Sequence, residues 1–516
     1  MFHTQYGTPC SQLVTKTDLR YHLYVSPRDN GAIFICRPST AHTYLQDLLQ
    51  NDISEDALHH HAENLEAIAY STPDRNRVFG SLGYNFSALY IHKTLAPLSD
   101  YYDITWQPFT AVYSNYNTTL SVTGTDRNAG RMTFSPSGHV EAPIVAISNN
   151  GCDAADFPEN VSGNIALISR GGCEYGLKSA LAGAAKAAGV VIYNNQGGDE
   201  RLWGTLIERS RPEGPYPPTV GISQNAGRTI LTSMASRERI GNLTVEGRVE
   251  DRVTMNLIAQ TKAGDQNNVL VLGAHADSVE AGPGIQDNGS GVSCLLEVAL
   301  QLAKYNVTNA VRFAWWSAEE FGLAGAQYYV DQSAAADLDR IRLYINFDMI
   351  ASPNYILGIY DGDASDSPEG IAAGPAGSGE AELLFTKYLE DVGQMSTPIY
   401  FNNRSDYQAF IYSGIPSTGP FTGAEGTKTA ADAAAYGGTV GQAYDPNYHK
   451  VGDTVDNLNM EAFLINTKAA AHAVATYATS FASLGTRKLK RRSALVPEAH
   501  SHATGCQEHN HGDHGF

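Results

Sequence analysis

Hydrophobic and polar positions in the second half of the chain alternate between short apolar runs and longer segments with helical spacing. The apolar runs, typical of buried strands, are VLVLG (269–273), VRFAWWS (311–317) and RLYINFDM (342–349). Helical spacing covers 291–305, 323–332 and 379–393, and a long Ala-rich helix is predicted at about 460–484. Strands that alternate with helices in this way predict an α/β domain with a mixed, mostly parallel sheet flanked by helices.

A smaller α/β pattern lies earlier in the chain. Strands at 143–148, 164–172 and 190–195, with a helix at 178–189, predict a compact inserted unit. On either side of it, the stretches 101–122 and 255–278 are both predicted to be rich in strands. Before these, 62–83 has a helical pattern, and ALYIHKTLAPL (88–98) reads as extended.

These patterns predict the domain boundaries. We expect an N-terminal segment (1–55) that is a candidate propeptide, a first part of the main domain (56–123), the insert (124–246), the remainder of the main domain (247–484) and a disordered tail (485–516) that is first basic and then His-rich.

Charge and composition restrict the function class. Of the 516 residues, 35 are Lys or Arg and 54 are Asp or Glu, which gives a formal net charge of -19. This acidic balance argues against nucleic acid as a partner. Because no apolar run approaches the roughly 20 residues that cross a bilayer, we expect no membrane span.

Cysteines and glycosylation sequons indicate the compartment. Cys152 and Cys173 flank one short stretch and could close a single bridge, whereas Cys294 reads as a buried free thiol. Since the first residues lack the apolar core of a signal peptide, the chain is either cytosolic or lacks its signal in this sequence. The sequons, the paired cysteines and the low charge favour a secreted or vacuolar glycoprotein. The sequons expected to carry glycans are at Asn85, Asn117, Asn160, Asn242 and Asn306. Two others, Asn288 and Asn403, fall in expected active-site loops and are discounted.

Five segments of the main domain carry ionisable residues, several of them directly after predicted strands, where α/β sheets place their sites. They contain His275, Asp277 and Asp287; Glu319 and Glu320; Asp348; Tyr448 and His449; Arg404 and Asp406. Each residue alone has a simpler explanation, such as a hydrogen-bonded histidine, a solvated helix start or a surface ion pair. Together, two imidazoles and three carboxylates form a ligand set that suits Zn²⁺ and is large enough for two ions. A spare Glu beside a ligand Glu is what metal-assisted hydrolysis requires.

The motifs HADS, DNGSG, EEFGLxG, NFDMI and Tyr-His occur in this order, and the chain closely resembles the co-catalytic dizinc aminopeptidases, especially fungal vacuolar aminopeptidase Y and related secreted enzymes. The resemblance covers about 62–484 and implies the zinc exopeptidase fold. The insert resembles the protease-associated domain of that subfamily. One difference is that many relatives carry cysteines near the Tyr-His pair, where this chain has Asn447 and Gly452.

The resemblance also implies roles for single residues. His275 and Asp348 would bind one zinc ion, Glu320 and His449 the other, and Asp287 would bridge them. Asp277 would orient His275, and Glu319 would be the general base that acts on zinc-activated water. Tyr448 would hydrogen-bond the tetrahedral oxyanion, while Arg404 and Phe421 would line the substrate side.

The resulting hypothesis is a monomeric metallo-aminopeptidase with two Zn²⁺ ions per chain that acts on peptides with a free N-terminus. Two alternatives remain open from the sequence: a dizinc carboxypeptidase of the same fold, and a non-catalytic receptor-like relative. Such receptors typically lose ligands or the base, whereas here every position is filled. The basic run 487–492 and the histidines of the tail read as a solvated end.

Overall fold

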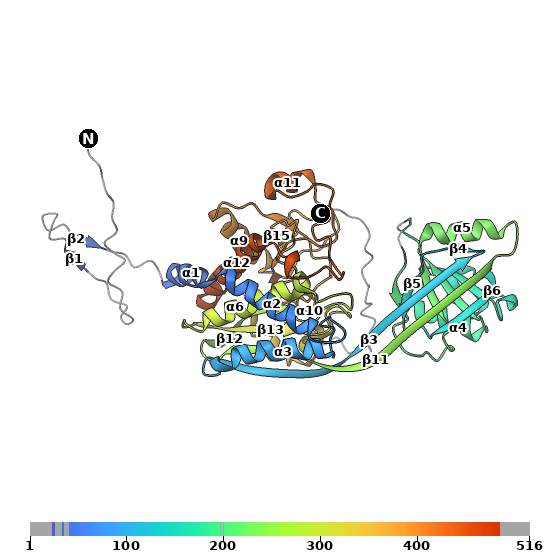
Figure 1. Cartoon of the computed structure of the whole chain (residues 1–516), viewed down its shortest axis with the longest axis horizontal. Helices are drawn as coiled ribbons and strands as arrows, with labels where there is room; N and C mark the ends of the chain where they lie inside the picture. Colours follow the sequence, from blue (N-terminus) through green and yellow to red (C-terminus); the bar gives the residue numbers. More distant parts are fainter. Residues whose placement is uncertain (1–22, 26–32, 36–40, 197, 200, 486–516) are drawn as a thin grey trace.

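The computed structural model describes residues 23–25, 33–35, 41–196, 198–199 and 201–485. These residues form a large α/β lobe and a smaller α/β lobe, joined by two long strands (Figure 1). The predicted tail and most of the predicted N-terminal segment lie outside the described residues. The predicted fold class, a mostly parallel sheet flanked by helices with a smaller inserted α/β domain, is confirmed.

The sheet of the large lobe has a parallel centre. Strands β17 (Ser417–Thr418), β14 (Ile341–Asn346), β12 (Asp265–His275) and β13 (Asn309–Trp316) lie side by side and run parallel. The long strand β11 (Ile240–Thr261) pairs with β13 in the antiparallel sense. A separate small sheet contains β16 (Thr397–Ile399), β15 (Gly358–Tyr360) and β18 (Pro420–Phe421). Strands β1 (Leu23–Val25) and β2 (Ile33–Ile35) pair with each other.

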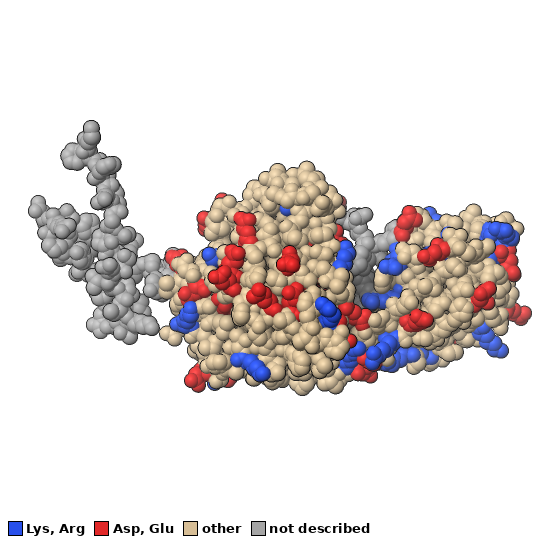
Figure 2. Space-filling model, viewed as in Figure 1, with Lys and Arg blue, Asp and Glu red and all other residues tan. Residues whose placement is uncertain are grey.

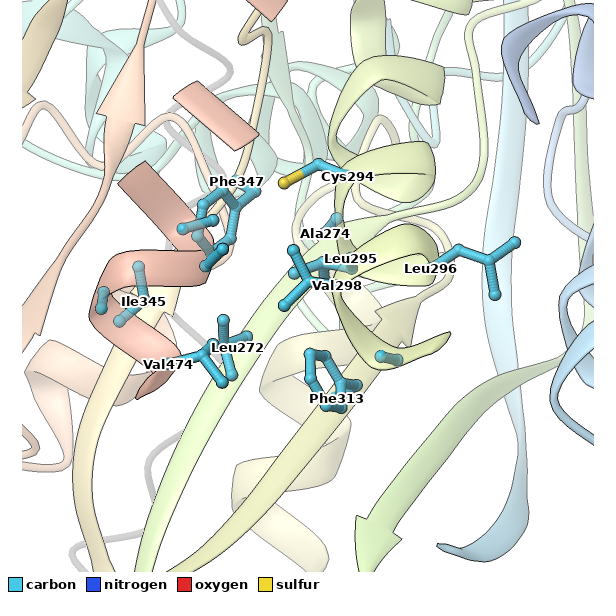
Figure 3. Close-up of a cluster of buried hydrophobic side chains, with 14 of the residues drawn as sticks. Leu272, Ala274, Cys294, Leu295, Leu296, Val298, Phe313, Ile345, Phe347 and Val474 are labelled. Atoms are coloured by element: carbon cyan, nitrogen blue, oxygen red, sulfur yellow. The ribbon is translucent and has the colours of Figure 1, made fainter. Parts of the chain in front are cut away.

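Helices cover both faces of this sheet because alternate strand residues point to opposite sides. Leu270, Leu272 and Phe313 belong to one buried cluster, part of which Figure 3 shows, whereas Val271 and Ala314 belong to the other. The first face is covered by α1 (Ala41–Asp52), α2 (Glu55–Tyr70), α3 (Leu82–Leu95), α6 (Ser290–Leu302), α9 (Ser378–Asp391) and α12 (Met460–Thr479). The second face is covered by α7 (Ala324–Gln332) and α10 (Tyr407–Tyr412), and the short helices α8 (Ala335–Leu338) and α11 (Ala430–Tyr436) complete the lobe.

Two predictions from local pattern have different outcomes. The extended reading of 88–98 is wrong, because 88–95 belong to α3 and Ala96–Leu98 form a 3-10 turn directly after it. Ser81 caps its N-terminus, and Tyr84, Ala88 and Ile91 are buried at helical spacing. Cys294 is a buried free thiol, as predicted.

The two lobes are connected by an antiparallel ribbon of β3 (Tyr102–Val122) and β11, which pair from Tyr102 and Thr261 to Val122 and Gly241. Beyond it, β6 (Gly138–Ala146), β7 (Ile165–Ser169), β8 (Gly189–Tyr193) and β10 (Thr219–Ile222) extend the sheet, followed by β5 (Gly130–Thr133) and β9 (Gly204–Thr205). Strand β4 (Thr125–Asp126) pairs with β3, and helices α4 (Tyr175–Ala184) and α5 (Gln224–Met234) pack on this smaller lobe. The disulfide between Cys152 and Cys173 is confirmed.

Surface properties agree with the composition. Acidic side chains outnumber basic ones on the face of the large lobe that Figure 2 shows. Among the described residues, no helix combines the length and apolar character needed to cross a membrane. Of the sequons expected to carry glycans, Asn117, Asn160 and Asn306 are exposed, and Asn85 and Asn242 are half-buried. The discounted Asn288 is 0% exposed.

Candidate metal centre

Three neighbouring parallel strands bring the predicted ligands to one edge of the sheet. Strand β12 ends at His275, Glu319 and Glu320 follow β13, and Asp348 follows β14. Because these strands are adjacent and parallel, their carboxyl ends meet. Asp287 lies in the irregular turn Ile285–Gly289 that precedes α6.

His449 comes from the loop before α12 and completes what we call the ligand cluster: His275, Asp287, Glu319, Glu320, Asp348 and His449.

The two oxygens of Asp287 face two different imidazoles. Asp287 Oδ1 lies 3.3 Å from His275 Nε2, and Asp287 Oδ2 lies 3.2 Å from His449 Nε2. Asp348 Oδ1 is 3.3 Å from His275 Nε2, while Glu320 Oε2 is 3.0 Å from His449 Nε2. The cluster therefore divides into two halves that share one carboxylate.

These separations fit divalent metal ions. Two ligand atoms about 2.0–2.1 Å from one tetrahedral zinc ion lie about 3.4 Å apart, close to the four distances above. Among the described residues, Asp348 Oδ1, Glu320 Oε1 and His449 Nε2 are buried without a hydrogen-bond partner. Buried polar atoms are rarely left in this way unless another group satisfies them. Two groups that could each hold an ion, His275–Asp287–Glu320 and His275–Glu319–Asp348, overlap at His275.

The electrostatics of the protein alone reflect this crowding of charge. Burial lowers the pKa of His275, but the carboxylates of Glu319 and Asp348 outweigh burial and raise the pKa well above its usual value. In His449, burial is likewise outweighed, by Glu320 and Asp287, and the pKa rises to about 10. Metal binding must displace these protons, because an imidazole ligand is neutral at the coordinating nitrogen.

Asp277 lies behind both His275 and Glu319. The Nδ1 atom of His275 is 3.2 Å from the backbone oxygen of Asp277 and 3.7 Å from its carboxylate Oδ1. The same Oδ1 accepts the backbone N–H of Glu319 at 3.1 Å. Burial raises the pKa of Asp277 to about 7, although nearby His275 lowers it. One buried carboxylate therefore contacts both an imidazole of the cluster and the loop that carries Glu319.

Glu319 has the environment of a proton acceptor. Burial raises the pKa of its carboxyl well above the usual value; His275 lowers it and Glu320 raises it further. Its Oε2 lies 3.8 Å from His275 Nε2, farther than the oxygens of Asp287 and Asp348. A general base works best with a pKa near the operating pH, and burial shifts the pKa of Glu319 upward from the usual range of a carboxyl.

Tyr448 and Arg404 lie together beside the cluster. The Tyr448 ring stacks on the His449 ring with centroids 3.8 Å apart. Arg404 Nη2 donates to Tyr448 Oη at 3.1 Å, and Arg404 Nη1 pairs with Glu425 Oε1 at 2.6 Å. Phe421 belongs to an aromatic group nearby, with its ring centroid 6.4 Å from that of Tyr360. The predicted ligands, catalytic residues and substrate-side residues therefore lie in one region, and the guanidinium of Arg404 already pairs with a carboxylate.

Sequence reasoning missed several side chains that support the cluster. Asp453 accepts the backbone N–H groups of Gln286 and Asp287 at 2.7 and 3.0 Å. Ser405 Oγ donates to Asp348 Oδ2 at 2.6 Å. Arg77, whose contacts are described below, is fully buried. The signals for Asp453 and Ser405 were their closeness in sequence to His449 and Arg404; Arg77 had none.

Comparisons with known proteins identify relatives of both lobes. The family model described as Peptidase family M28 matches residues 256–474, and the PA domain model matches 140–230. A probable leucine aminopeptidase 2 of Aspergillus oryzae is 46% identical over 470 residues, which cover 89% of this chain and 94% of the relative. Leucine aminopeptidase 2 of Arthroderma otae is 44% identical, over 90% of this chain and 92% of the relative.

Solved structures give the same fold. An aminopeptidase from Aneurinibacillus sp. strain AM-1 superposes with a TM-score of 0.64 at 24% identity, covering 83% of this chain and 95% of that chain. A zinc aminopeptidase from Bacillus subtilis superposes with a TM-score of 0.55 at 25% identity, covering 81% of this chain and 94% of that chain.

Proposed function

This chain belongs to peptidase family M28, and from that membership we propose that it releases N-terminal residues from peptides with two zinc ions held by the ligand cluster. Zinc-dependent aminopeptidase activity agrees with the relatives of known name and with the zinc aminopeptidase of the same fold. The observation that carries the count of two is the position of Asp287, with one oxygen toward each imidazole.

The proposed ligand assignment follows the two halves of the cluster. His275 and Asp348 would bind one ion, His449 and Glu320 would bind the other, and Asp287, which has one oxygen toward each imidazole, would contribute to both. Zinc bound there supplies Lewis acidity toward the scissile carbonyl and lowers the pKa of water. Glu319 takes the proton from the attacking water and returns it to the leaving amine. Asp277 holds the imidazole of His275 and the backbone of Glu319 in position.

Tyr448 is the proposed hydrogen-bond donor to the oxyanion. Burial raises the pKa of Tyr448 well above 10, although Arg404 lowers it, so the phenol keeps its proton at neutral pH. Because the phenolic oxygen accepts from Arg404, its own proton is directed to a different acceptor. A donor that is fixed before the reaction stabilises developing charge without reorganisation.

The charge of the site favours an aminopeptidase over a carboxypeptidase. Holding a C-terminal carboxylate requires a cationic group, but Arg404 is engaged by both oxygens of Glu425 at 2.6 and 3.3 Å. Asp406 is buried, and among the described residues neither of its carboxylate oxygens has a hydrogen-bond partner. A region so rich in carboxylates suits the ammonium group of a free N-terminus. The complete ligand set likewise disfavours a non-catalytic receptor.

An apolar N-terminal residue is the preferred substrate in this proposal. Tyr360, Phe401 and Phe421 form an aromatic group, with Tyr360 and Phe401 stacked at 5.0 Å between centroids. Phe401 and Phe421 are half-buried, so part of each ring is accessible and can contact an apolar side chain. The names of the relatives, leucine aminopeptidases, point to the same preference. We also propose a secreted or vacuolar monomer that carries glycans at the predicted sequons.

The test is hydrolysis of a panel of aminoacyl-p-nitroanilides, with free and N-acetylated amines, with and without 1,10-phenanthroline. Peptides with a blocked N-terminus and a free C-terminus belong to the same panel, and metal content is measured in parallel. We expect turnover of the free-amine anilides alone, highest for Leu, with loss on chelation and in Glu319→Ala. About two zinc ions per chain without turnover of any substrate would favour the receptor, and cleavage only from the C-terminus would favour the carboxypeptidase.

A further inference from the structure

A short segment between α2 and α3, residues 76–79, contacts two of the loops that carry the ligand cluster: the loop from His275 to Asp287 and the loop that carries Glu319 and Glu320. Its Arg77 is 0% exposed, and none of the described carboxylates forms an ion pair with it. A buried charge without such a partner needs other compensation. Arg77 obtains it from backbone carbonyl oxygens: Nε donates to Pro283 at 2.7 Å, Nη1 to Ala276 at 2.5 Å, and Nη2 to Gly284.

These carbonyls belong to the loop that links His275 to Asp287. Ala276 directly follows His275, and Gly284 precedes Asp287 by three positions. One planar guanidinium therefore holds both ends of the loop, which five donors in a fixed geometry allow and a lysine ammonium does not. Its contacts constrain the separation between the first imidazole of the cluster and the shared carboxylate.

Further hydrogen bonds hold the same loop at its middle. The N–H of Arg77 donates to Ser278 Oγ at 2.9 Å, and the N–H of Ser278 donates to the Arg77 carbonyl at 3.3 Å. Asn76 Nδ2 donates to the carbonyl of Glu280 at 3.1 Å. Helix α3 packs closely on the segment, because a Cβ added at Gly83 would lie 1.9 Å from the Asn76 carbonyl oxygen.

The segment 76–79 also contacts the loop that carries Glu319 and Glu320. The buried ring of Phe79 meets the ring of Phe321 edge-on, with centroids 4.9 Å apart. Phe321 directly follows Glu319 and Glu320. Tyr113, from the ribbon to the smaller lobe, packs on Phe321 as well, at 5.5 Å.

We propose that Arg77 is a positioning residue of the metal centre: its guanidinium holds the His275–Asp287 loop in the geometry that the two zinc ions need. The inference rests on the proposed function, because it takes the ligand cluster as the zinc site. Its positive charge also lies near the carboxylates of Asp277, Asp453, Asp287 and Glu320, whose interactions with Arg77 are favourable.

The experiment uses the full chain with Arg77→Lys, which keeps the charge, and Arg77→Met, which keeps only the apolar stem. Arg340, which is exposed and pairs with Asp337 at 2.8 Å, supplies the matched controls Arg340→Lys and Arg340→Met. Three quantities are measured: zinc affinity by competition with a chelator, kcat and KM for leucyl-p-nitroanilide, and melting temperature with and without zinc.

We expect both Arg77 variants to lose 10- to 100-fold in zinc affinity, the loss typical of groups that orient ligands. We also expect a lower kcat at saturating zinc with KM changed less than about threefold, and no change in the Arg340 variants. Wild-type zinc affinity and kcat in folded Arg77→Lys and Arg77→Met would overturn the proposal. So would a lower melting temperature alone, with zinc affinity unchanged, since that result indicates a purely structural role.

Chemical rescue keeps the proposal testable where a variant folds poorly. In Arg77→Ala, about 10 mM methylguanidinium should restore zinc affinity, and methylammonium at the same concentration should not; equal effects of the two cations would refute the positioning role. Zinc affinity is measured without turnover. An unsubstituted protein that binds zinc but cleaves no anilide would therefore refute the proposed function, while the zinc affinities of the Arg77 variants would still test the positioning role.

Discussion

The pair formed by Arg404 and Tyr448 allows a quantitative test of how Tyr448, the proposed hydrogen-bond donor to the oxyanion, is held. Arg404 Nη2 donates to Tyr448 Oη at 3.1 Å, and the guanidinium is fixed on its other side by Glu425. If Arg404 acts through Tyr448, replacing Arg404 should no longer lower kcat once the phenolic hydroxyl of Tyr448 has been removed. If Arg404 instead contacts the substrate, replacing Arg404 should lower activity by the same factor whether or not the phenolic hydroxyl is present.

The expected magnitudes follow from these roles. Removing one donor to an oxyanion typically lowers kcat by 10²- to 10³-fold, or about 3–4 kcal/mol, and Tyr448→Phe should fall in this range with KM nearly unchanged. Arg404→Met should cost about tenfold in kcat, near the lower end for a hydrogen bond to a charged group. In the double variant, Arg404→Met should add less than about twofold, so the coupling energy is about 1 kcal/mol.

The assay is steady-state hydrolysis of leucyl-p-nitroanilide and of a leucyl peptide, with Tyr412→Phe as the matched control because Tyr412 is exposed. Additive losses in the double variant would refute the positioning of Tyr448 by Arg404. A higher KM for the peptide but not for the anilide in Arg404→Met would instead assign Arg404 to the substrate. Because the pKa of Tyr448 is raised well above 10, ionisation of this group should cause no loss of activity up to about pH 10.

Three further predictions concern other parts of the chain. Asp277→Asn should weaken zinc binding 10- to 100-fold, measured by chelator competition; an unchanged affinity would exclude a role in orienting His275. Burial, together with nearby acidic groups, raises the pKa of the half-buried Glu382 from 4.5 to about 7. As the pH rises between these two values, the unfolded state releases a proton that the folded state retains, so the free energy of unfolding falls. Glu382→Gln should therefore be more stable than wild type by about 1–2 kcal/mol at pH 8, after allowance for solvent screening, and equal at about pH 4 or below in urea titrations; a difference that does not change with pH would contradict this. Replacing Cys152 and Cys173 by Ser opens a loop with a sequence separation of 21 and should destabilise the smaller lobe by about 3 kcal/mol, seen as an earlier melting transition; an unchanged transition would show that the bridge adds no stability.

The ligand cluster could be predicted from the sequence because its residues carry their chemistry in their own side chains. His275, Glu320 and Asp348 follow apolar strands, and the carboxyl ends of neighbouring parallel strands meet whatever the remaining sequence is. The ordered motifs then restricted the interpretation to one family.

Other features depend on pairings between distant residues. The ribbon joins 102–122 to 240–261, and alternation in each strand alone does not identify its partner. The segment 88–98 was misread because its aromatic and β-branched residues favour strands, whereas burial at Tyr84, Ala88 and Ile91 settles the helix. Arg404 was predicted on the substrate side, but its ion pair with Glu425 depends on how two loops meet.

Arg77 illustrates the deeper reason why supports are harder to predict than ligands. The partners of Arg77 are backbone carbonyls, which every residue has. No pattern of side chains in the loop 276–284 therefore predicts the contact. The same segment reaches Phe321 through Phe79, and the ribbon that carries the smaller lobe reaches Phe321 through Tyr113. The inserted lobe therefore leaves the ligands on the sheet of the large lobe, while the ribbon that carries it packs on Phe321, the residue that follows Glu319 and Glu320 in sequence. Changes at that aromatic contact should thus affect the metal centre more than changes within the smaller lobe.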